Sequence, residues 1–215
     1  MPRQNILVFC AHSDDQIIGP GATLAKYARE GKNIYTIIFS YGEAALAWWR
    51  PEVAIKTRVK EAKKADKVIG GKGVVFFGLK ENKFLEQAEE RNLFKKIQKI
   101  IEEKKPVKIF THSSEDPHPD HRAVYKIIIE ALDKSKYKCD LFSFAIWNPF
   151  TFRRTHFPKM YVDITDTFKI KLKALKVFES QKITLFTILW SVYAKALIYG
   201  FQIHTRYAEE FLKIR

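Results

Sequence analysis

The stretch NILVFCAHSDDQ, residues 5–16, decides both the fold and the place of the functional site. Residues 5–11 are a short continuous apolar run, which is typical of a parallel strand covered on both faces. His12, Asp14 and Asp15 follow at once, in the position where the strand-to-helix turn of a nucleotide-binding protein would carry glycines. The segment GPGATLAKYAREG, residues 19–31, has helix formers ended by Gly31. The stretch therefore predicts a buried strand with a polar loop at its carboxyl end.

The alternation of apolar runs and helical patterns continues along most of the chain. Further strands are predicted at residues 33–40, 73–78, 107–113 and 139–147, and helices at about 52–69, 86–104 and 120–132. Residues 160–181 predict an edge strand followed by a helix. This order predicts an α/β fold with a mainly parallel sheet, helices on both faces and ligands at its carboxyl edge. No linker composition interrupts it, so residues 1–215 are predicted to form a single domain with a C-terminal helical portion from about residue 166.

The composition excludes a disordered chain, because 47% of the 215 residues are hydrophobic and 14% are aromatic. The net charge of +14 admits nucleic acid, an anionic membrane surface or an acidic substrate as a partner. Many lysines lie in mixed-charge helical stretches such as EAKKADK (61–67), which favours solvated helix faces. No nucleic-acid motif, repeat or low-complexity tract accompanies the charge, so we expect no nucleic-acid partner.

The two cysteines, Cys10 and Cys139, lie in apolar strand-like runs and predict small buried thiols of a reduced compartment. The N-terminal apolar run is too short for a signal peptide and has no small-residue cleavage site. We therefore expect a cytoplasmic protein.

A second polar cluster, HPDH at residues 118–121, follows the predicted strand at 107–113. Loops after parallel strands share one edge of a doubly wound sheet, so this cluster is expected to converge with His12, Asp14 and Asp15. His12, Asp15 and one histidine of the second loop would give two imidazoles and a carboxylate, the open three-ligand arrangement of a catalytic zinc site. A metal ion held there would lower the pKa of its bound water, and the remaining aspartate could take the proton.

Simpler interpretations exist for each cluster on its own. A His-x-x-Asp turn is commonly a cap or a surface hydrogen-bonding group, and HPDH suits a polar turn with a helix N-cap. Two such clusters at the ends of two predicted parallel strands favour the metal site. The chain has no complete dinucleotide fingerprint, no phosphate loop and no Gly-x-Ser-x-Gly elbow, which leaves hydrolysis by metal-activated water.

The two motifs are similar to those of the PIG-L/LmbE-like family of zinc-dependent N-deacetylases, A-H-P-D-D-E and H-P-D-H. The similarity extends to RVKEAKKADKVIGG (58–71), FFGLKENKF (76–84), YVDIT (161–165), KALKVFESQ (173–181) and YAEEF (207–211). The resemblance implies a Rossmann-like three-layer αβα fold of the LmbE type. It also implies a Zn2+-dependent hydrolase, with another divalent metal as the alternative cofactor, that removes the N-acetyl group from an N-acetylglucosamine-type sugar. That sugar could be free, conjugated or part of a glycolipid, and the products are acetate and a free amine.

The resemblance also implies roles for individual residues. The implied zinc ligands are His12, Asp15 and His121. Asp14 would be the general base, and His118 would stabilise the oxyanion or protonate the leaving amine. Asp120 would orient the ring of His118.

Arg58 and Glu81 are the predicted substrate-binding residues. The resemblance aligns Arg58 with an arginine that contacts sugar, although a charge on the helix surface is an equally good interpretation. Lys80 and Glu81 stand where the family usually has a proline and an aspartate that can reach a sugar hydroxyl. Ser13 replaces the proline of the first motif and could cap the following helix, and Gln16 replaces a glutamate. The sequence therefore defines the reaction type better than the substrate.

The late apolar segment, residues 183–201, has few polar side chains, namely Thr184, Thr187, Ser191 and Lys195. On a helix these four would share one arc of about 80°. We expect first a buried helix or a subunit interface of a homo-oligomer, because the segment lies between two stretches that resemble the family domain. The second interpretation is a helix that covers a substrate tail or makes peripheral membrane contact, with basic residues on an anionic lipid headgroup. A membrane span is the third, and it needs about 20 apolar residues and would bury Lys195.

The competing function is a non-catalytic protein on the same scaffold that binds a sugar, a lipid or nucleic acid. A stoichiometric divalent metal with an open coordination position would favour the enzyme. A steep loss of affinity with salt would mark a nucleic-acid binder.

Overall fold

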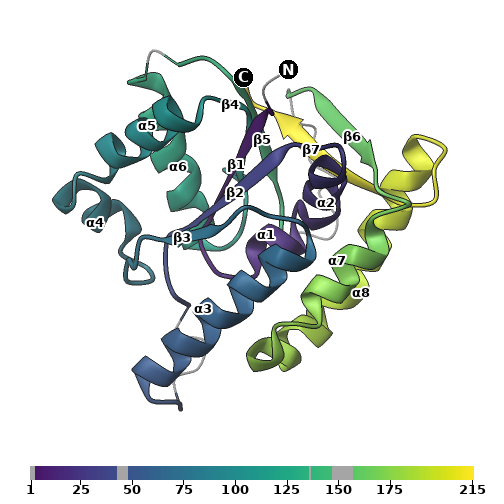
Figure 1. The fold of residues 1–215 in the computed structure, drawn as a ribbon, viewed down its shortest axis with the longest axis horizontal. Helices are drawn as coiled ribbons and strands as arrows, with labels where there is room; N and C mark the ends of the chain where they lie inside the picture. The colour runs from purple at the N-terminus through teal and green to yellow at the C-terminus, as the bar shows by residue number, and fades with distance from the viewer. Residues whose placement is uncertain (1–2, 43–47, 136, 147–156) are drawn as a thin grey trace.

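The computed structural model describes residues 3–42, 48–135, 137–146 and 157–215, and the strands in this part of the chain form one sheet (Figure 1). The order across the sheet is β3-β2-β1-β4-β5-β7-β6. Strands β1 to β5 pair in parallel, and β7 pairs antiparallel with both β5 and β6. The predicted mainly parallel sheet is thus confirmed. The strands are β1 (Asn5–Cys10), β2 (Asn33–Ile38), β3 (Val74–Phe76), β4 (Pro106–His112), β5 (Asp140–Phe144), β6 (Lys159–Asp163) and β7 (Ala208–Lys213).

Helices cover both faces of the sheet, which confirms the predicted three-layer αβα arrangement (Figure 1). The helices on one face are α1 (Asp15–Ile18), α2 (Gly21–Arg29), α3 (Pro51–Val68), α7 (Phe168–Leu175) and α8 (Lys182–Gln202), with the short 3-10 helix η2 (Glu179–Gln181) leading into α8. Those on the other face are α4 (Phe84–Glu90), α5 (Leu93–Lys104) and α6 (Pro119–Asp133).

Strand β1 lies between the two helical layers. Its side chains at Ile6, Val8 and Cys10 belong to one core, and those at Leu7 and Phe9 belong to the other. All of them are fully buried. Because successive side chains of a strand point to opposite faces, a strand covered on both sides is apolar at every position. This burial accounts for the continuous apolar run in the sequence.

The direction of winding reverses between β1 and β4. The chain proceeds from β1 through β2 to β3 on one side, and then returns to place β4 and β5 on the other side. In open α/β sheets, the crevice for a ligand forms at this switch point, outside the carboxyl ends of the strands. The loops that follow β1 and β4 carry the two polar clusters, so the fold places both clusters at this crevice.

Three parts of the chain differ from the predictions. The helix predicted at 86–104 is divided into α4 and α5, because Asn92 adopts a left-handed conformation (φ 51°) at the start of α5. The C-terminal strand β7, which the alternation pattern did not indicate, lies between β5 and β6. The strand predicted at 139–147 ends at Phe144, and residue 147 lies outside the described residues.

A buried ion pair joins β7 to the helices beside the first polar loop. The Glu209 carboxylate accepts the backbone N–H groups of Ala22 (3.2 Å) and Thr23 (2.8 Å), and so caps α2, whose own N-cap is a proline. Lys171 of α7 donates to Glu209 at 2.7 Å. The C-terminal strand thereby fixes the segment that follows the AHSDDQ turn.

Helix α8 turns two of the four polar residues of segment 183–201, Ser191 and Lys195, toward the protein, and Thr184 and Thr187 are exposed. Ser191 is buried, and Lys195 donates to the backbone carbonyls of Ala145 (3.4 Å) and Ile146 (3.0 Å). Within the described residues, Glu179–Gln202 is one helical stretch long and apolar enough to cross a membrane by length and composition alone, and 28% of its apolar window is buried. The expectation that α8 is a buried helix is therefore wrong for the outer side of α8. The two other interpretations, a subunit interface and contact with a membrane surface, are both compatible with this exposed side.

Candidate metal centre

The turn after β1 places His12 and Asp15 beside each other. Asp15 opens α1, where the first turn of a helix favours an acidic side chain. Its Oδ2 accepts the backbone N–H of His12 at 2.8 Å and lies 3.6 Å from His12 Nδ1. Asp15 is 3% exposed. The carboxylate is therefore held inside the protein with one histidine already beside it.

His121 brings the second loop into contact with this pair. It lies in the first turn of α6, and its Nε2 is 3.4 Å from Asp15 Oδ1. One ligand atom from each of His12, Asp15 and His121 lies within 4.8 Å of the others. His121 Nε2 is buried without a hydrogen bond to any described residue, an arrangement that is rare for a ring nitrogen and that a metal ligand requires. The structure thus brings together the three predicted ligands, and their donor set fits a divalent ion.

Two buried residues that were not singled out from the sequence support this centre. Asp116 Oδ1 lies 2.9 Å from His121 Nδ1, so the far side of the histidine ring faces a carboxylate, as is usual for metal-bound histidines. His112, the last residue of β4, stacks on His121 with ring centroids 3.9 Å apart and lies 3.2 Å from Asp15 Oδ2. Both signals were present in the sequence, as a histidine at the end of a predicted strand and an aspartate two residues before HPDH.

Burial and the carboxylates together set the protonation of the cluster. Burial by itself would lower the pKa of His12, but Asp120 and Asp15 raise it to about 10. Burial also opposes the protonation of His121, yet Asp15 raises its pKa to about 9. Burial would raise the pKa of Asp15, whereas His121 and His112 hold it well below its usual range. The carboxylates therefore favour positive charge at the cluster of His12, Asp15 and His121. Protons on the histidines can supply this charge, and so can a bound divalent cation.

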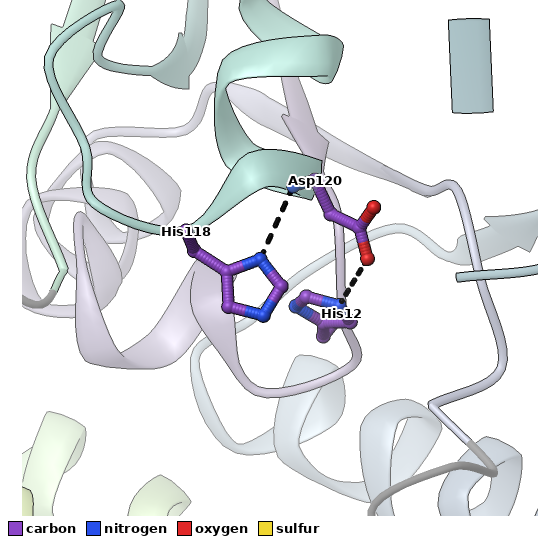
Figure 2. A group of neighbouring side chains, drawn as sticks. All are labelled: His12, His118 and Asp120. Carbon is purple, nitrogen blue, oxygen red and sulfur yellow. Dashed lines mark hydrogen bonds and ion pairs between the residues drawn. The ribbon is translucent and has the colours of Figure 1, made fainter. Parts of the chain in front are cut away.

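His118 and Asp120 lie beside His12, but one of their contacts differs from the predicted one (Figure 2). His118 Nδ1 accepts the backbone N–H of Asp120 at 3.2 Å and so caps α6. The Asp120 carboxylate lies 3.4 Å from His12 Nε2 and accepts the backbone N–H of Asn82 at 2.8 Å. The backbone of Asp120 therefore orients His118, as expected for that residue, while its side chain orients His12.

A cavity of about 310 Å3 opens beside these residues. Its walls include predicted site residues from four segments of the chain, namely His12, Asp14, Asp15, Arg58, Glu81 and His118. The other two predicted residues, Asp120 and His121, are buried behind them. The 3-10 helix η2 contributes Gln181, and the start of α8 contributes Thr184 and Ile188; none of the three was predicted as a site residue. Helix α8 is thus part of the site.

Arg58 is a buried cation inside the site. It is 2% exposed, so the interpretation as a charge on the helix surface is wrong. Its Nη2 lies 3.7 Å from Asp14 Oδ1. Gly42 (φ +75°) permits the approach of this guanidinium, because a Cβ there would lie 2.8 Å from Arg58 Nη2.

The two departures from the first family motif are both fully buried. Gln16 Nε2 donates to the carbonyl of Ser13 at 2.8 Å and closes the turn. The Ser13 hydroxyl makes no hydrogen bond to a described residue, and α1 has no side-chain cap. The prediction that Ser13 caps the following helix is therefore wrong, and Gln16 has the structural role instead.

The fold and the site define a class of protein: an α/β enzyme with a candidate metal centre and adjoining aspartate, histidine and arginine side chains at the switch point of its sheet. Residues 7–132 match the model of the PIG-L family, described as GlcNAc-PI de-N-acetylase, and the chain belongs to this family.

Relatives of known sequence and structure agree with this assignment. The chain is 28% identical to the diacetylchitobiose deacetylase of Thermococcus kodakarensis over 224 residues. This alignment covers 96% of this chain and 81% of the relative. The N,N′-diacetylchitobiose deacetylase structure from Pyrococcus horikoshii matches with a TM-score of 0.81 at 24% identity, over 98% of this chain and 84% of that one. The structure of GalB, the 4-carboxy-2-hydroxymuconate hydratase of Pseudomonas putida, matches with a TM-score of 0.82 at 20% identity. The match covers 99% of this chain and 96% of GalB. The fold is therefore the LmbE-like one, and the family confirms the predicted class of enzyme, a hydrolase of N-acetyl amides.

Proposed function

We propose that this protein is a zinc-dependent N-deacetylase that hydrolyses the acetamide of an N-acetylglucosamine-type sugar to acetate and a free amine. The observation that carries the proposal is one cavity whose walls combine the candidate ligands His12 and Asp15 with Asp14, His118 and Arg58. Metal ligands, a base, a hydrogen-bond donor and a cation are all needed within reach of one substrate, and this cavity supplies each of them.

Zinc suits the donors at this site. Two imidazoles and one carboxylate leave a coordination position open, as in catalytic zinc sites. When bound, the ion would lower the pKa of a water molecule and polarise the amide carbonyl. Asp116 behind His121 (2.9 Å) and Asp120 behind His12 (3.4 Å) would hold both rings in position for ligation.

Asp14 is the proposed general base. It is adjacent in the chain to the proposed ligand Asp15, yet its carboxylate is at the cavity wall and lies 3.7 Å from Arg58 Nη2. The guanidinium restrains the carboxylate by an ion pair, which leaves the other oxygen to accept the proton of the attacking water. The two neighbouring aspartates of the AHSDDQ turn therefore have different roles.

His118 is the proposed donor to the substrate carbonyl. Its Nδ1 accepts the backbone N–H of Asp120, so the neutral ring carries its proton on Nε2. Burial, His12 and His121 together lower the pKa of His118, which favours that neutral ring. A donor fixed in this way stabilises the negative charge that develops on the carbonyl oxygen.

Arg58 and Glu81 are the proposed contacts for sugar hydroxyls. Both line the cavity, whose volume of about 310 Å3 is at the small end of typical ligand sites, about 300 to 1,000 Å3. A cavity of this size suits one amino-sugar ring, with any conjugated group lying toward the opening. The deacetylase relatives act on diacetylchitobiose, which is consistent with this substrate class.

The test is acetate release by the zinc-loaded protein from a panel of acetylated sugars. The panel contains N-acetylglucosamine, N,N′-diacetylchitobiose, an inositol conjugate and a lipid-linked form. Acetate together with an equal amount of free amine from any of them would support the proposal. Because GalB is a hydratase on the same fold, 4-carboxy-2-hydroxymuconate is included. Its hydration, with no acetate from any sugar, would overturn the proposal.

A matched pair of variants tests the assignment of the sugar contact. Glu81→Gln should raise KM for the best sugar by roughly tenfold, because a hydrogen bond to a charged group typically contributes about 1.5 to 3 kcal/mol. Glu86→Gln alters an exposed acid of the neighbouring helix α4 and should leave KM unchanged. Equal KM values for both variants would remove Glu81 from the site.

A further inference from the structure

One side of α8 carries an exposed row of large hydrophobic side chains. We call it the apolar stripe, and it consists of Ile183, Phe186, Trp190, Leu197, Ile198 and Phe201. Ile183, Phe186 and Phe201 are 83%, 81% and 81% exposed. The spacing of three, four and seven residues puts them on one side of the helix. The solvent side of the helix is therefore mainly apolar, although Thr184 and Thr187 are exposed too, whereas an ordinary surface helix has a charged outer side.

The apolar stripe is concentrated rather than scattered. It holds six of the thirteen exposed large hydrophobic side chains among the described residues. Single exposed hydrophobic residues are normal, but a contiguous patch marks a surface that meets another apolar phase. Trp190 and two phenylalanines belong to the types of side chain that favour the boundary between water and lipid.

Exposed basic residues lie on the segments that lead into the apolar stripe. Exposed lysines on α7, at its C-cap and at the start of α8 form what we call the basic rim, Lys169, Lys173, Lys176 and Lys182. Lys169 and Lys173 lie four residues apart on α7, so they share one side of that helix. Exposed acids in the same part of the chain are Asp166 and Glu179. The rim is therefore basic overall.

A hollow adjoins the start of the apolar stripe and continues the same character. Its volume is about 540 Å3, and its walls include Trp48, Trp49, Lys60, Lys64 and Lys182. Trp48 is 75% exposed. Glu61 and Glu179 also line the hollow. Lysines together with exposed tryptophans suit an anionic lipid surface, which offers headgroup charge outside and acyl chains within.

The charges distinguish between the two occupants that an apolar face could have. In a contact between two copies of this chain, stripe against stripe, the lysine end of α8 would meet either the same lysines or the far end, where His204 and Arg206 are exposed. The first arrangement sets the four rim lysines against the same four, with only Asp166 and Glu179 among them, the second sets them against further basic residues, and the chain carries a net charge of +14. An anionic bilayer offers both an apolar interior and the opposite charge.

We propose that the apolar stripe, the basic rim and the hollow dock this protein onto the surface of an anionic lipid bilayer, with α8 lying in the plane of the interface. The proposal does not depend on which reaction the cavity performs. Docking nevertheless concerns the cavity, because Thr184 and Ile188 of the same helix line it. A bilayer on the outer side of α8 would thus lie one helix away from the metal centre.

The experiment is co-sedimentation of the full chain with vesicles. Wild type should bind vesicles of phosphatidylcholine containing phosphatidylglycerol, and bind poorly to pure phosphatidylcholine. The variant Ile183→Ser/Phe186→Ser/Phe201→Ser should bind the anionic vesicles about tenfold more weakly or worse, since it removes the inserted side chains. These side chains are almost fully exposed, so the variant should unfold at the wild-type temperature. Leu85→Ser, at an exposed leucine of α4, is the matched control and should bind as wild type does.

The basic rim is tested separately. Lys173→Glu/Lys182→Glu should lose binding to the anionic vesicles, and Lys95→Glu, at an exposed lysine of α5, should not. Three results would overturn the proposal. The first is that wild type does not bind anionic vesicles. The second is that wild type and the triple serine variant bind them equally. The third is that wild type is a dimer, the serine variant is a monomer, and neither protein binds lipid.

Discussion

Asp116 offers a way to perturb the metal centre without changing a proposed ligand. Its carboxylate lies 2.9 Å from His121 Nδ1, and it accepts the backbone N–H groups of His118 (3.0 Å) and Ile146 (3.2 Å). Asp116→Asn keeps the shape and one acceptor oxygen but removes the negative charge behind the His121 ring. Loss of such an outer carboxylate typically weakens metal binding 10- to 100-fold, which is about 1.4 to 2.7 kcal/mol. Because Asp116 is buried and close to the ring, we expect the upper end of that range.

The assay is competition for zinc between the protein and a chromophoric chelator. Asp140→Asn is the control, because Asp140 pairs with Lys213 at 2.9 Å on the partly exposed starting end of β5, away from the site. The control should bind zinc as wild type does. If Asp116→Asn binds zinc as tightly as wild type, while its thermal unfolding is also unchanged, the reasoning that Asp116 supports His121 is refuted.

Two further predictions concern stability. Glu209→Ala leaves Lys171 buried without its partner and removes the cap of α2, so the free energy of unfolding in urea should fall by about 3 to 5 kcal/mol. Glu30→Ala, at an exposed acid, should cost little, and a similar loss in both variants would contradict this account of the pair. Burial raises the pKa of Asp66 from 3.8 to about 6 in the folded protein. The folded state then binds this proton more tightly than the unfolded state, so ionisation of Asp66 should lower stability by roughly 3 kcal/mol as the pH rises from about 4 to 6. Asp66→Asn should remove that component from the pH dependence of urea unfolding, and identical pH dependence in both proteins would show that the group is not responsible.

The parallel half of the fold and the converging loops could be predicted because their causes are local. A strand covered on both faces is apolar throughout, and polar residues directly after it fall at the ligand-binding edge. The convergence of His12 and Asp15 with a histidine of the second loop followed from these two facts, and the family resemblance implied that this histidine is His121. His112 and Asp116 carry the same kind of signal, but their role depends on contact with His121 across the sheet edge, which spacing alone does not reveal.

The rest of the fold depends on contacts between distant segments. Strand β7 contains Glu209, which is buried only because Lys171 and the start of α2 receive its charge, and a strand with a buried acid has no clean alternation. The division between α4 and α5 depends on Asn92 entering a left-handed conformation amid helix formers. In α8, hydropathy predicts an apolar helix but cannot indicate which side the remaining chain covers. The cavity wall formed by its first turn was missed for the same reason.

Hydrolysis of an acetamide by metal-activated water, with Asp14 as the base, is the central claim. The most direct measurement is acetate release by zinc-loaded Asp14→Asn, with the zinc content determined on the same sample. Because Asp14 lies at the cavity wall and outside the proposed ligand set, the variant should keep its zinc while acetate release falls by about 10^2- to 10^4-fold. Acetate release within a few-fold of wild type by the zinc-loaded variant would contradict the claim.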